Sequence, residues 1–257
     1  MSDDGSVVEV LVPCVDVTDG RAVDPVRFSG IRDPHDPAEI ARWYAAHGVS
    51  RIFFDVLDDW DGIHTVSPLV SSLRGSGVSV LMSVGNGRLR SVSAAERLLD
   101  EGVSALSVST DAVENPSVVE RLARTVEEGR IMGAVNAGEG PLGPWSAYVH
   151  GGRTAAGEEA PAFARRLAEL GARLILANSA DREGTGLGYD HALTRAVAGA
   201  SGVPVIASGG CGRVDHLVEA LESGTADYVL ANKALHRGDL PLHELLGRSA
   251  ERENPSR

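Results

Sequence analysis

Two glycine-rich segments, about half a chain apart, contain the residues best suited to bind phosphate groups. Val78–Arg88 (VSVLMSVGNGR) aligns with Val203–Arg213 (VPVIASGGCGR) without a gap. Glycines at a turn between a strand and a helix allow backbone N–H groups to converge on an anion. We therefore predict a phosphate site after each segment and a ligand with a phosphate at each end, although glycines that serve only tight turns would give the same pattern.

Each predicted phosphate site is completed by polar residues that follow the next apolar run of the sequence. The first site is expected to comprise Gly85, Gly87, Ser109 and Thr110, and the second Gly209, Gly210, Asn232 and Lys233. Lys233 has two alternative roles. It is either a cationic clamp for phosphate or a desolvated amine that acts as a base or forms a Schiff base with a carbonyl substrate.

Asp16 is the best candidate for a general acid or base. It closes an apolar run, and a partly buried carboxyl group beside a bound substrate can be tuned toward neutral pH. The alternative is that Asp16 only caps a loop. Asp55 follows Phe53 and Phe54 and is equally consistent with acid–base chemistry and with a structural hydrogen-bond acceptor.

The elements that must position these residues are eight short apolar runs, which alternate with stretches of helical spacing. The runs are Val8–Val17, Arg51–Val56, Val78–Val84, Ala105–Ser109, Arg130–Asn136, Arg173–Ser179, Val203–Gly209 and Tyr228–Lys233. Strands that are apolar throughout are typical of parallel sheets covered by helices. The number of runs favours an α/β fold with an eight-stranded parallel (βα)8 barrel, a TIM barrel, over an open doubly wound sheet.

A barrel of this kind brings the candidate residues together, because its active site lies at the carboxyl ends of the strands. The other polar residues and glycines expected to contact the ligand there are His150, Asn178, Glu183 and Gly184. The internal repeat predicts two half-barrels, about residues 7–127 and 128–248, within a single domain over 1–257. Residues 249–257 are predicted to be a disordered tail.

The composition excludes several classes of partner. The 257 residues include 36 acidic and 24 basic side chains, a net charge of −12, which disfavours nucleic acid and anionic membranes because the electrostatic term is repulsive. No apolar run approaches about 18 residues and the start lacks a signal-peptide pattern, so we expect a cytoplasmic protein. Two cysteines and the absence of metal-ligand spacing predict neither a disulfide scaffold, nor a metal site, nor a cofactor.

Several motifs together resemble the cyclase subunit of imidazole glycerol phosphate synthase, a barrel enzyme of histidine biosynthesis. They are Val12–Arg21, His150–Arg153, Asp181–Thr185, Gly188–Asp190, Leu193–Val197 and Pro204–Gly210 with Gly212 and Arg213. The similarity runs from about Val10 to Leu246, and the combination separates the chain from the sister isomerase of that pathway. The resemblance implies a bis-phosphate substrate, two catalytic aspartates, and ammonia that arrives through the barrel from a glutaminase subunit.

The chain departs from that family pattern at functionally important positions. Asp16 matches the first catalytic aspartate, but the second position holds Asn136, which cannot exchange a proton near neutral pH. A lysine of the family's mobile first loop is replaced by Asp24, and Arg27 is a candidate replacement for the lost cation. The four charged residues of the ammonia gate are matched by the uncharged Val10, Ser50, Ala105 and Leu174. Coupling to a glutaminase is therefore disfavoured.

These observations favour a divergent, repurposed lyase or cyclase with Asp16, Asn136 and Lys233 as its catalytic side chains. Its expected substrate is a phosphorylated ribosyl-like or ribulosyl-like compound, and its reaction a carbon–nitrogen bond-forming or ring-closing step outside core histidine synthesis. Two alternatives stay open. The chain is either an unaltered cyclase that uses ammonia or a non-catalytic protein that binds a phosphorylated ligand.

Overall fold

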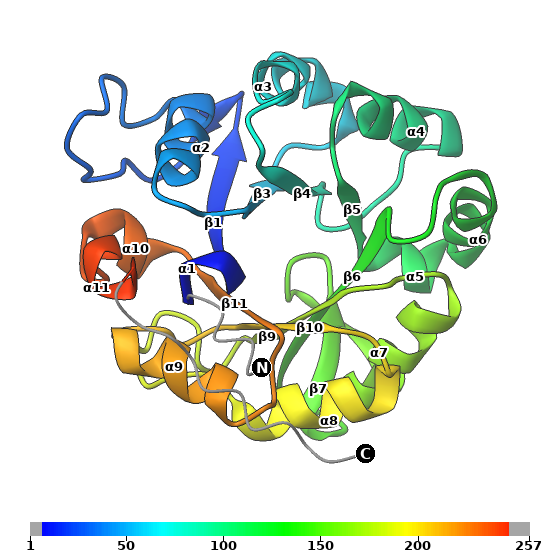
Figure 1. The fold of residues 1–257 in the computed structure, drawn as a ribbon. Coiled ribbons are helices and arrows are strands. Elements are labelled where there is room, and N and C mark those ends of the chain that lie inside the picture. The colour runs from blue at the N-terminus through cyan, green and yellow to red at the C-terminus, as the bar shows by residue number, and fades with distance from the viewer. Residues whose placement is uncertain (1–6, 247–257) are drawn as a thin grey trace, which may run out of the picture.

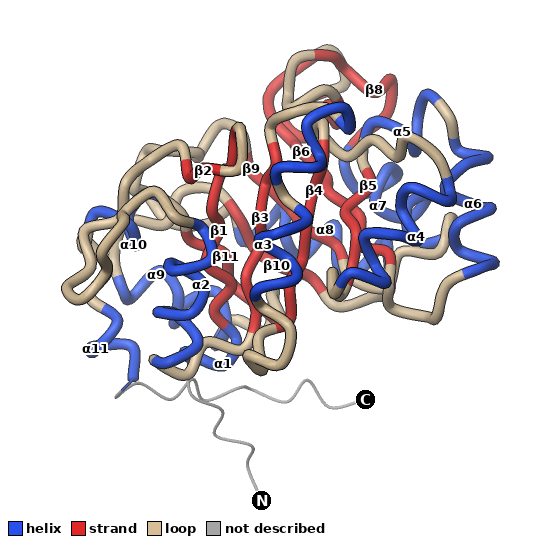
Figure 2. Tube along the Cα trace, turned by 90° about the horizontal axis from the view of Figure 1, so that it is seen from above, coloured by secondary structure: helices blue, strands red, loops and turns tan. Residues whose placement is uncertain are grey.

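Eight parallel strands form a closed barrel, which Figure 1 shows along its axis and Figure 2 from the side. The computed structural model describes residues 7–246, and the predicted tail 249–257 lies outside this range. Each barrel strand pairs with the next, and the last pairs with the first. The strands are β1 (Leu11–Thr18), β3 (Arg51–Val56), β4 (Ser79–Val84), β5 (Ala105–Val108), β6 (Ile131–Gly140), β9 (Ile175–Ser179), β10 (Val205–Ser208) and β11 (Tyr228–Ala231). The predicted TIM barrel is confirmed.

Helices surround the barrel and bury their apolar sides against it (Figure 1). The longer ones are α2 (Pro37–Ala46), α3 (Ser67–Ser72), α4 (Val92–Glu101), α6 (Pro116–Thr125), α7 (Ala160–Glu169), α8 (His191–Ser201) and α9 (Val214–Glu222). Helix α4 illustrates the local rules. Its N-cap Ser91 accepts a hydrogen bond from the backbone of Ala94 at 3.1 Å, and Gly102 ends the helix with a positive φ of 126°.

The side chains inside the barrel change from apolar to polar along each strand. Alternate residues of a strand point to the same side. The lower part of the interior is an apolar cluster of Val12, Cys14, Phe53, Leu81, Ala105, Met132, Leu176, Ile206 and Leu230. The next inward positions, toward the carboxyl ends, are polar. The fold therefore places a polar layer directly above an apolar filling, and this layer forms the bottom of the site.

The first predicted strand, Val8–Val17, is wrong at its beginning. Val7–Val10 form the short helix α1, in which Val7 and Val8 are buried, and β1 starts only at Leu11. A short apolar run has no period that distinguishes a buried strand from a buried helical turn.

Several short elements connect the predicted ones. They are β2 (Arg21–Ala22), η1 (Trp60–Thr65), α5 (Thr110–Glu114), β7 (Gly143–Val149), β8 (Thr154–Glu159), α10 (Lys233–Arg237) and α11 (Leu242–Leu246). Strands β7 and β8 continue antiparallel from β6, so the connection that carries His150 is a hairpin rather than an irregular loop.

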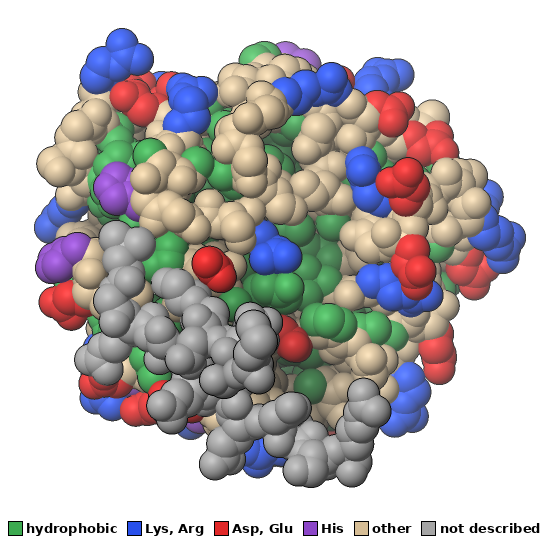
Figure 3. Space-filling model, in the orientation of Figure 1, with side chains coloured by type: hydrophobic (Ala, Val, Ile, Leu, Met, Phe, Trp, Pro, Cys, Tyr) green, Lys and Arg blue, Asp and Glu red, His purple; other side chains and the backbone are tan. Residues whose placement is uncertain are grey.

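The amino-terminal side of the barrel carries uncharged residues at the four positions where the resemblance to the cyclase subunit implies a charged gate. Ala105 belongs to the interior apolar cluster, and Leu174 packs against it. The Ser50 hydroxyl donates to the backbone oxygen of Glu9 at 3.0 Å. Nearby, the Arg51 guanidinium lies 4.4 Å from the centre of the Tyr228 ring. Figure 3 shows the face that carries α1, where hydrophobic side chains gather around the centre.

Candidate active site

A cavity of about 790 Å³ opens at the carboxyl ends of the barrel strands. Most of the predicted site residues line it, although they come from distant parts of the sequence. They are Asp16, Gly87, Ser109, Asn136, Asn178, Glu183, Gly184, Gly209, Gly210, Asn232 and Lys233. The predicted Gly85, Thr110 and His150 are not part of its lining.

One half of the cavity floor is acidic. Asp16 and Asp55 are register partners on the neighbouring strands β1 and β3, and both line the cavity. Oδ1 of Asp16 accepts a hydrogen bond from Nδ2 of Asn232 at 3.1 Å and a longer one from the Cys14 thiol at 3.6 Å. Burial raises the pKa of Asp16, and these two donors and the charge of Lys233 oppose that rise.

Asp55 is the more strongly perturbed carboxyl group. Burial, followed by the nearby charge of Asp16, raises its pKa to about 6, and Glu183 adds to the rise. Only a hydrogen bond from Ser83 acts in the opposite direction. The sequence left the role of Asp55 open, and the structure places it beside the best acid–base candidate.

The other half of the floor consists of amides and a hydroxyl. Nδ2 of Asn178 donates to Oδ1 of Asn136 at 3.0 Å, and Oδ1 of Asn178 accepts from the Ser208 hydroxyl at 3.0 Å. A weaker contact of 3.5 Å joins Nδ2 of Asn178 to the Glu183 carboxylate. Asn136 is thus fixed as part of a neutral hydrogen-bonded chain.

The two halves are built in the same register. Asp16 pairs with Asp55, and Asp55 with Ser83, on β1, β3 and β4. Asn136 pairs with Asn178, and Asn178 with Ser208, on β6, β9 and β10. Corresponding positions therefore carry carboxyl groups in one half and amides in the other.

The first predicted phosphate site is closely packed around Gly87. Its φ is +73°, and a Cβ atom there would lie 2.5 Å from the backbone nitrogen of Ser109, so only glycine fits. The Ser109 hydroxyl is buried and has no hydrogen-bond partner within the part of the chain that the structure describes. Arg153 lines the same cavity. A buried donor without a partner beside a cation suits an anionic ligand.

The second predicted site is formed by Gly210 and the start of α10. The backbone oxygen of Gly210 accepts from Gly188 at 2.8 Å, and a Cβ atom on Gly210 would lie 2.2 Å from the Gly188 oxygen. Lys233 and Arg237 line the cavity here. None of the ion pairs among residues 7–246 involves Lys233 or Arg153.

A family model described as "Histidine biosynthesis protein" matches residues 10–241. The chain belongs to this histidine biosynthesis protein family. The match extends from before the first barrel strand to beyond the last, and it includes every residue of the cavity floor. Members of the family are typically enzymes of histidine biosynthesis, and the family description covers the barrel as a class without separating the cyclase from its relatives.

In this histidine biosynthesis family member, His150 lies beside the cavity rather than in it. Its Nε2 is 2.7 Å from a Glu114 oxygen, and its Nδ1 is 3.4 Å from Arg88. The backbone N–H of His150 donates to the Thr110 hydroxyl, which in turn donates to the Asn86 backbone oxygen at 2.7 Å. His150 and Thr110 thus join the β7–β8 hairpin to the first glycine turn. Gly85 begins that turn, and a Cβ atom on it would lie 3.2 Å from a side-chain oxygen of Asp59.

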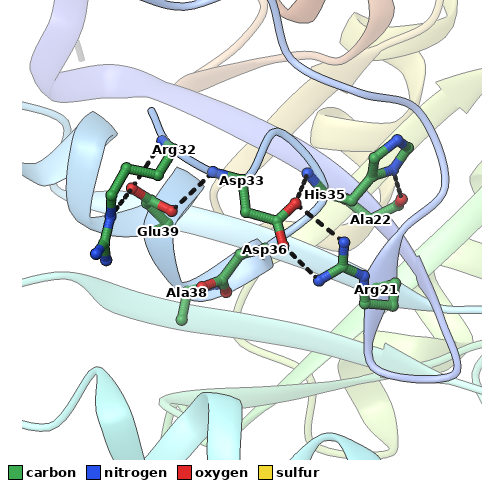
Figure 4. A network of polar contacts seen from close by, with 8 residues as sticks. All are labelled: Arg21, Ala22, Arg32, Asp33, His35, Asp36, Ala38 and Glu39. Carbon is green, nitrogen blue, oxygen red and sulfur yellow. Dashed lines mark hydrogen bonds and ion pairs between the residues drawn. The ribbon is translucent and has the colours of Figure 1, made fainter. Parts of the chain in front are cut away.

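The loop between β1 and α2 is held by a polar network, which Figure 4 shows. The Arg21 guanidinium donates twice to the Asp33 carboxylate, at 2.7 and 3.0 Å. Glu39 accepts from the backbone nitrogen of Asp33 at 3.1 Å. On the other side of the loop, the Phe28 ring stacks on Trp43 with 4.1 Å between their centres.

Asp24, at the position where the resemblance to the cyclase subunit implies a lysine, affects the electrostatics of the cavity. Asp24, at that position, raises the pKa of Asp16, where a lysine would lower it. The candidate replacement Arg27 is exposed and does not line the cavity. The cations that do line it are Arg153, Lys233 and Arg237. Of these, the sequence singled out only Lys233, although Arg153 lies in the His150–Arg153 motif.

Within residues 7–246, no three side chains of His, Cys, Asp or Glu are grouped so that they could hold a metal ion. None of the helices in this range is long and apolar enough to cross a membrane.

Proposed function

We propose that this protein is an enzyme that binds a sugar-derived ligand with a phosphate at each end and catalyses a ring-closing or carbon–nitrogen bond-forming or bond-breaking step on it. One observation carries the proposal: Asp16 lies on the floor between two glycine turns, each accompanied by a cation that no ion pair among the described residues occupies. A ligand held at both ends across this floor presents its middle to the carboxyl group.

The proposed reaction is related to that of the cyclase subunit of imidazole glycerol phosphate synthase without being identical to it. Asn136 occupies the second acid position and is held by Asn178, so that position supplies hydrogen bonds but no proton. The uncharged residues at the amino-terminal side of the barrel support a site that does not receive ammonia from a glutaminase. The unaltered cyclase reaction is the second candidate, favoured by the retained Asp16 and phosphate-site residues.

The test uses the bis-phosphate substrate of that cyclase, excess ammonium salt and the ultraviolet absorbance of the substrate. The unaltered cyclase predicts turnover that is lost in Asp16→Asn and unchanged in the exposed control Asp100→Asn. This result would reject the repurposed enzyme. Binding without turnover is the result expected from the proposal.

A panel of ribosyl and ribulosyl phosphates, with products analysed by mass spectrometry, then separates an enzyme from a binding protein. An Asp16-dependent product supports the proposal. Failure of every phosphate compound and of inorganic phosphate to bind would reject it.

A further inference from the structure

The cavity floor holds two carboxyl groups side by side. Asp16 and Asp55 occupy paired positions on strands that lie roughly 4.8 Å apart, and both side chains reach the cavity. Two such groups cannot both carry a negative charge without a substantial energetic cost. The negative charge of Asp16 therefore disfavours ionisation of Asp55.

The surroundings decide which of the two groups keeps the proton. Asp16 accepts hydrogen bonds from Asn232 and Cys14 and experiences the positive charge of Lys233, all of which stabilise its anion. Asp55 has one such contact, from Ser83.

The groups that face Asp55 favour its protonated form. They are Asp16 and the Cys14 thiol from β1, Ser83 from β4 and Glu183 from the segment after β9. Of these, the two carboxylates repel a charge on Asp55. With a pKa of about 6, Asp55 keeps its proton to a higher pH than an ordinary aspartate does.

The opposite half of the floor provides no replacement for this proton donor. Asn136, Asn178 and Ser208 form a chain of neutral groups, none of which exchanges a proton near neutral pH. Glu183 is the other carboxyl group of the cavity lining near this chain, and it contacts Nδ2 of Asn178. Asp55 is the carboxyl group that is both adjacent to Asp16 and short of donors.

We propose that Asp55 is the general acid of this site and that Asp16 is its general base, an inference that rests on the proposed function. Asp16 accepts a proton from an N–H or C–H group of the ligand. Asp55 gives its proton to a ligand oxygen or nitrogen on which negative charge develops, and becomes a carboxylate. Asp16 gains one proton and Asp55 loses one, so the total charge of the two carboxyl groups is unchanged. Transfer of a proton from Asp16 to Asp55 then restores the starting state.

The kinetic test measures kcat and kcat/KM against pH with the substrate found by the assays above. Asp55→Asn is expected to lower kcat by roughly 10² to 10⁴-fold with a smaller change in KM, and to remove the descending limb of the pH profile. Asp55→Glu, which keeps the acid, should recover part of the loss. The exposed Asp100→Asn is the matched control. The assignment of Asp55 as the general acid would be wrong if Asp55→Asn had the pH profile of the wild type. It would also be wrong if the descending limb moved in Glu183→Gln instead.

Ser83→Ala provides a second variant that keeps both carboxyl groups. Loss of the Ser83 hydroxyl removes the one donor to the Asp55 anion, so the descending limb should move to higher pH. A limb that moves to lower pH would contradict the proposal even if Asp55→Asn did not fold.

A titration without ligand separates this inference from the proposed function. In protein labelled with ¹³C at the aspartate carboxyl carbons, the signal lost in Asp55→Asn should titrate near pH 6, and Asp16→Asn should shift that titration to lower pH. If no phosphate substrate is turned over but this titration is observed, the proposed reaction fails and the carboxyl pair stands. If the enzyme is active but Asp55 titrates near pH 4, as an unperturbed aspartate does, the acid–base assignment of the pair is wrong and the proposed reaction still stands.

Discussion

Nδ2 of Asn178 donates a hydrogen bond to Oδ1 of Asn136 at 3.0 Å. A carboxylate oxygen accepts this bond as well as an amide oxygen does, so aspartate fits at position 136 without a change in Asn178. At position 136, this departure from the cyclases that the chain resembles is therefore reversible in structural terms.

Asn136→Asp is expected to create or raise cyclase activity on the bis-phosphate substrate of imidazole glycerol phosphate synthase with ammonium, by roughly 10²-fold or more over wild type. The new carboxyl group would supply the missing proton transfer on β6. Asn136→Ala, which has no proton to give, should show no gain. Equal rates in both variants would mean that another part of the site limits the reaction.

Asp55 should make the stability of the protein depend on pH. Its pKa is about 6 in the folded state and near 3.9 in the unfolded chain, so the folded state binds more protons between these values. The contribution of Asp55 to stability is fully present below pH 4 and is lost as pH rises through 6, by up to about 3 kcal/mol. Asp55→Asn should therefore be more stable than wild type at pH 8, with a difference that shrinks toward pH 4 in urea unfolding.

Asp100→Asn serves as the control for that measurement, because Asp100 is exposed on α4. It should change stability by the same small amount at both pH values. A constant difference between Asp55→Asn and wild type would contradict the raised pKa.

The two ends of the cavity should bind inorganic phosphate independently. Arg153→Gln and Lys233→Gln are each expected to weaken one of two sites by about tenfold or more, because each removes a charge-assisted hydrogen bond. Titration calorimetry or ³¹P NMR would measure both sites. Arg97→Gln on the exposed side of α4 is the matched control. A single site that weakens equally in both variants would refute the two-ended arrangement.

Lys233 is expected to act through its charge. It begins α10, lines the cavity and lowers the pKa of Asp16. Treatment with borohydride in the presence of a carbonyl substrate, followed by peptide mapping, should leave Lys233 unmodified. A reduced adduct on Lys233 would instead assign the lysine to Schiff-base chemistry.

The fold was predictable because its decisive signal is local. Apolar runs alternate with stretches of helical spacing along the chain, and the strand predicted over Arg51–Val56 begins and ends as expected. The start of β1 was not predictable. Val7 and Val8 are buried in a helical turn, and their burial is as complete as that of a strand residue.

From the sequence, a residue could be placed at the site only where its type has one main structural role at the end of a strand. Of the glycines after the two similar strands, Gly87, Gly209 and Gly210 line the cavity and Gly85 does not, and their role in phosphate binding stays a prediction. Asp55 stayed ambiguous, because its role depends on its pairing with Asp16 on another strand. The position of His150 was not predictable for the same reason, since its motif does not reveal that Glu114 contacts the ring beside the cavity, and its role in ligand binding stays a prediction.

The matching registers of the two halves have a consequence for a ligand with similar ends. Under the proposed function, such a ligand can enter the cavity in either direction, because a glycine turn and a cation line each side. In one direction its reactive atoms meet Asp16 and Asp55, and in the other they meet Asn136 and Asn178. The backward complex would be non-productive, so it would lower kcat and KM by the same factor and leave kcat/KM unchanged. The carboxyl groups in one half and the amides in the other therefore distinguish the two orientations of the ligand.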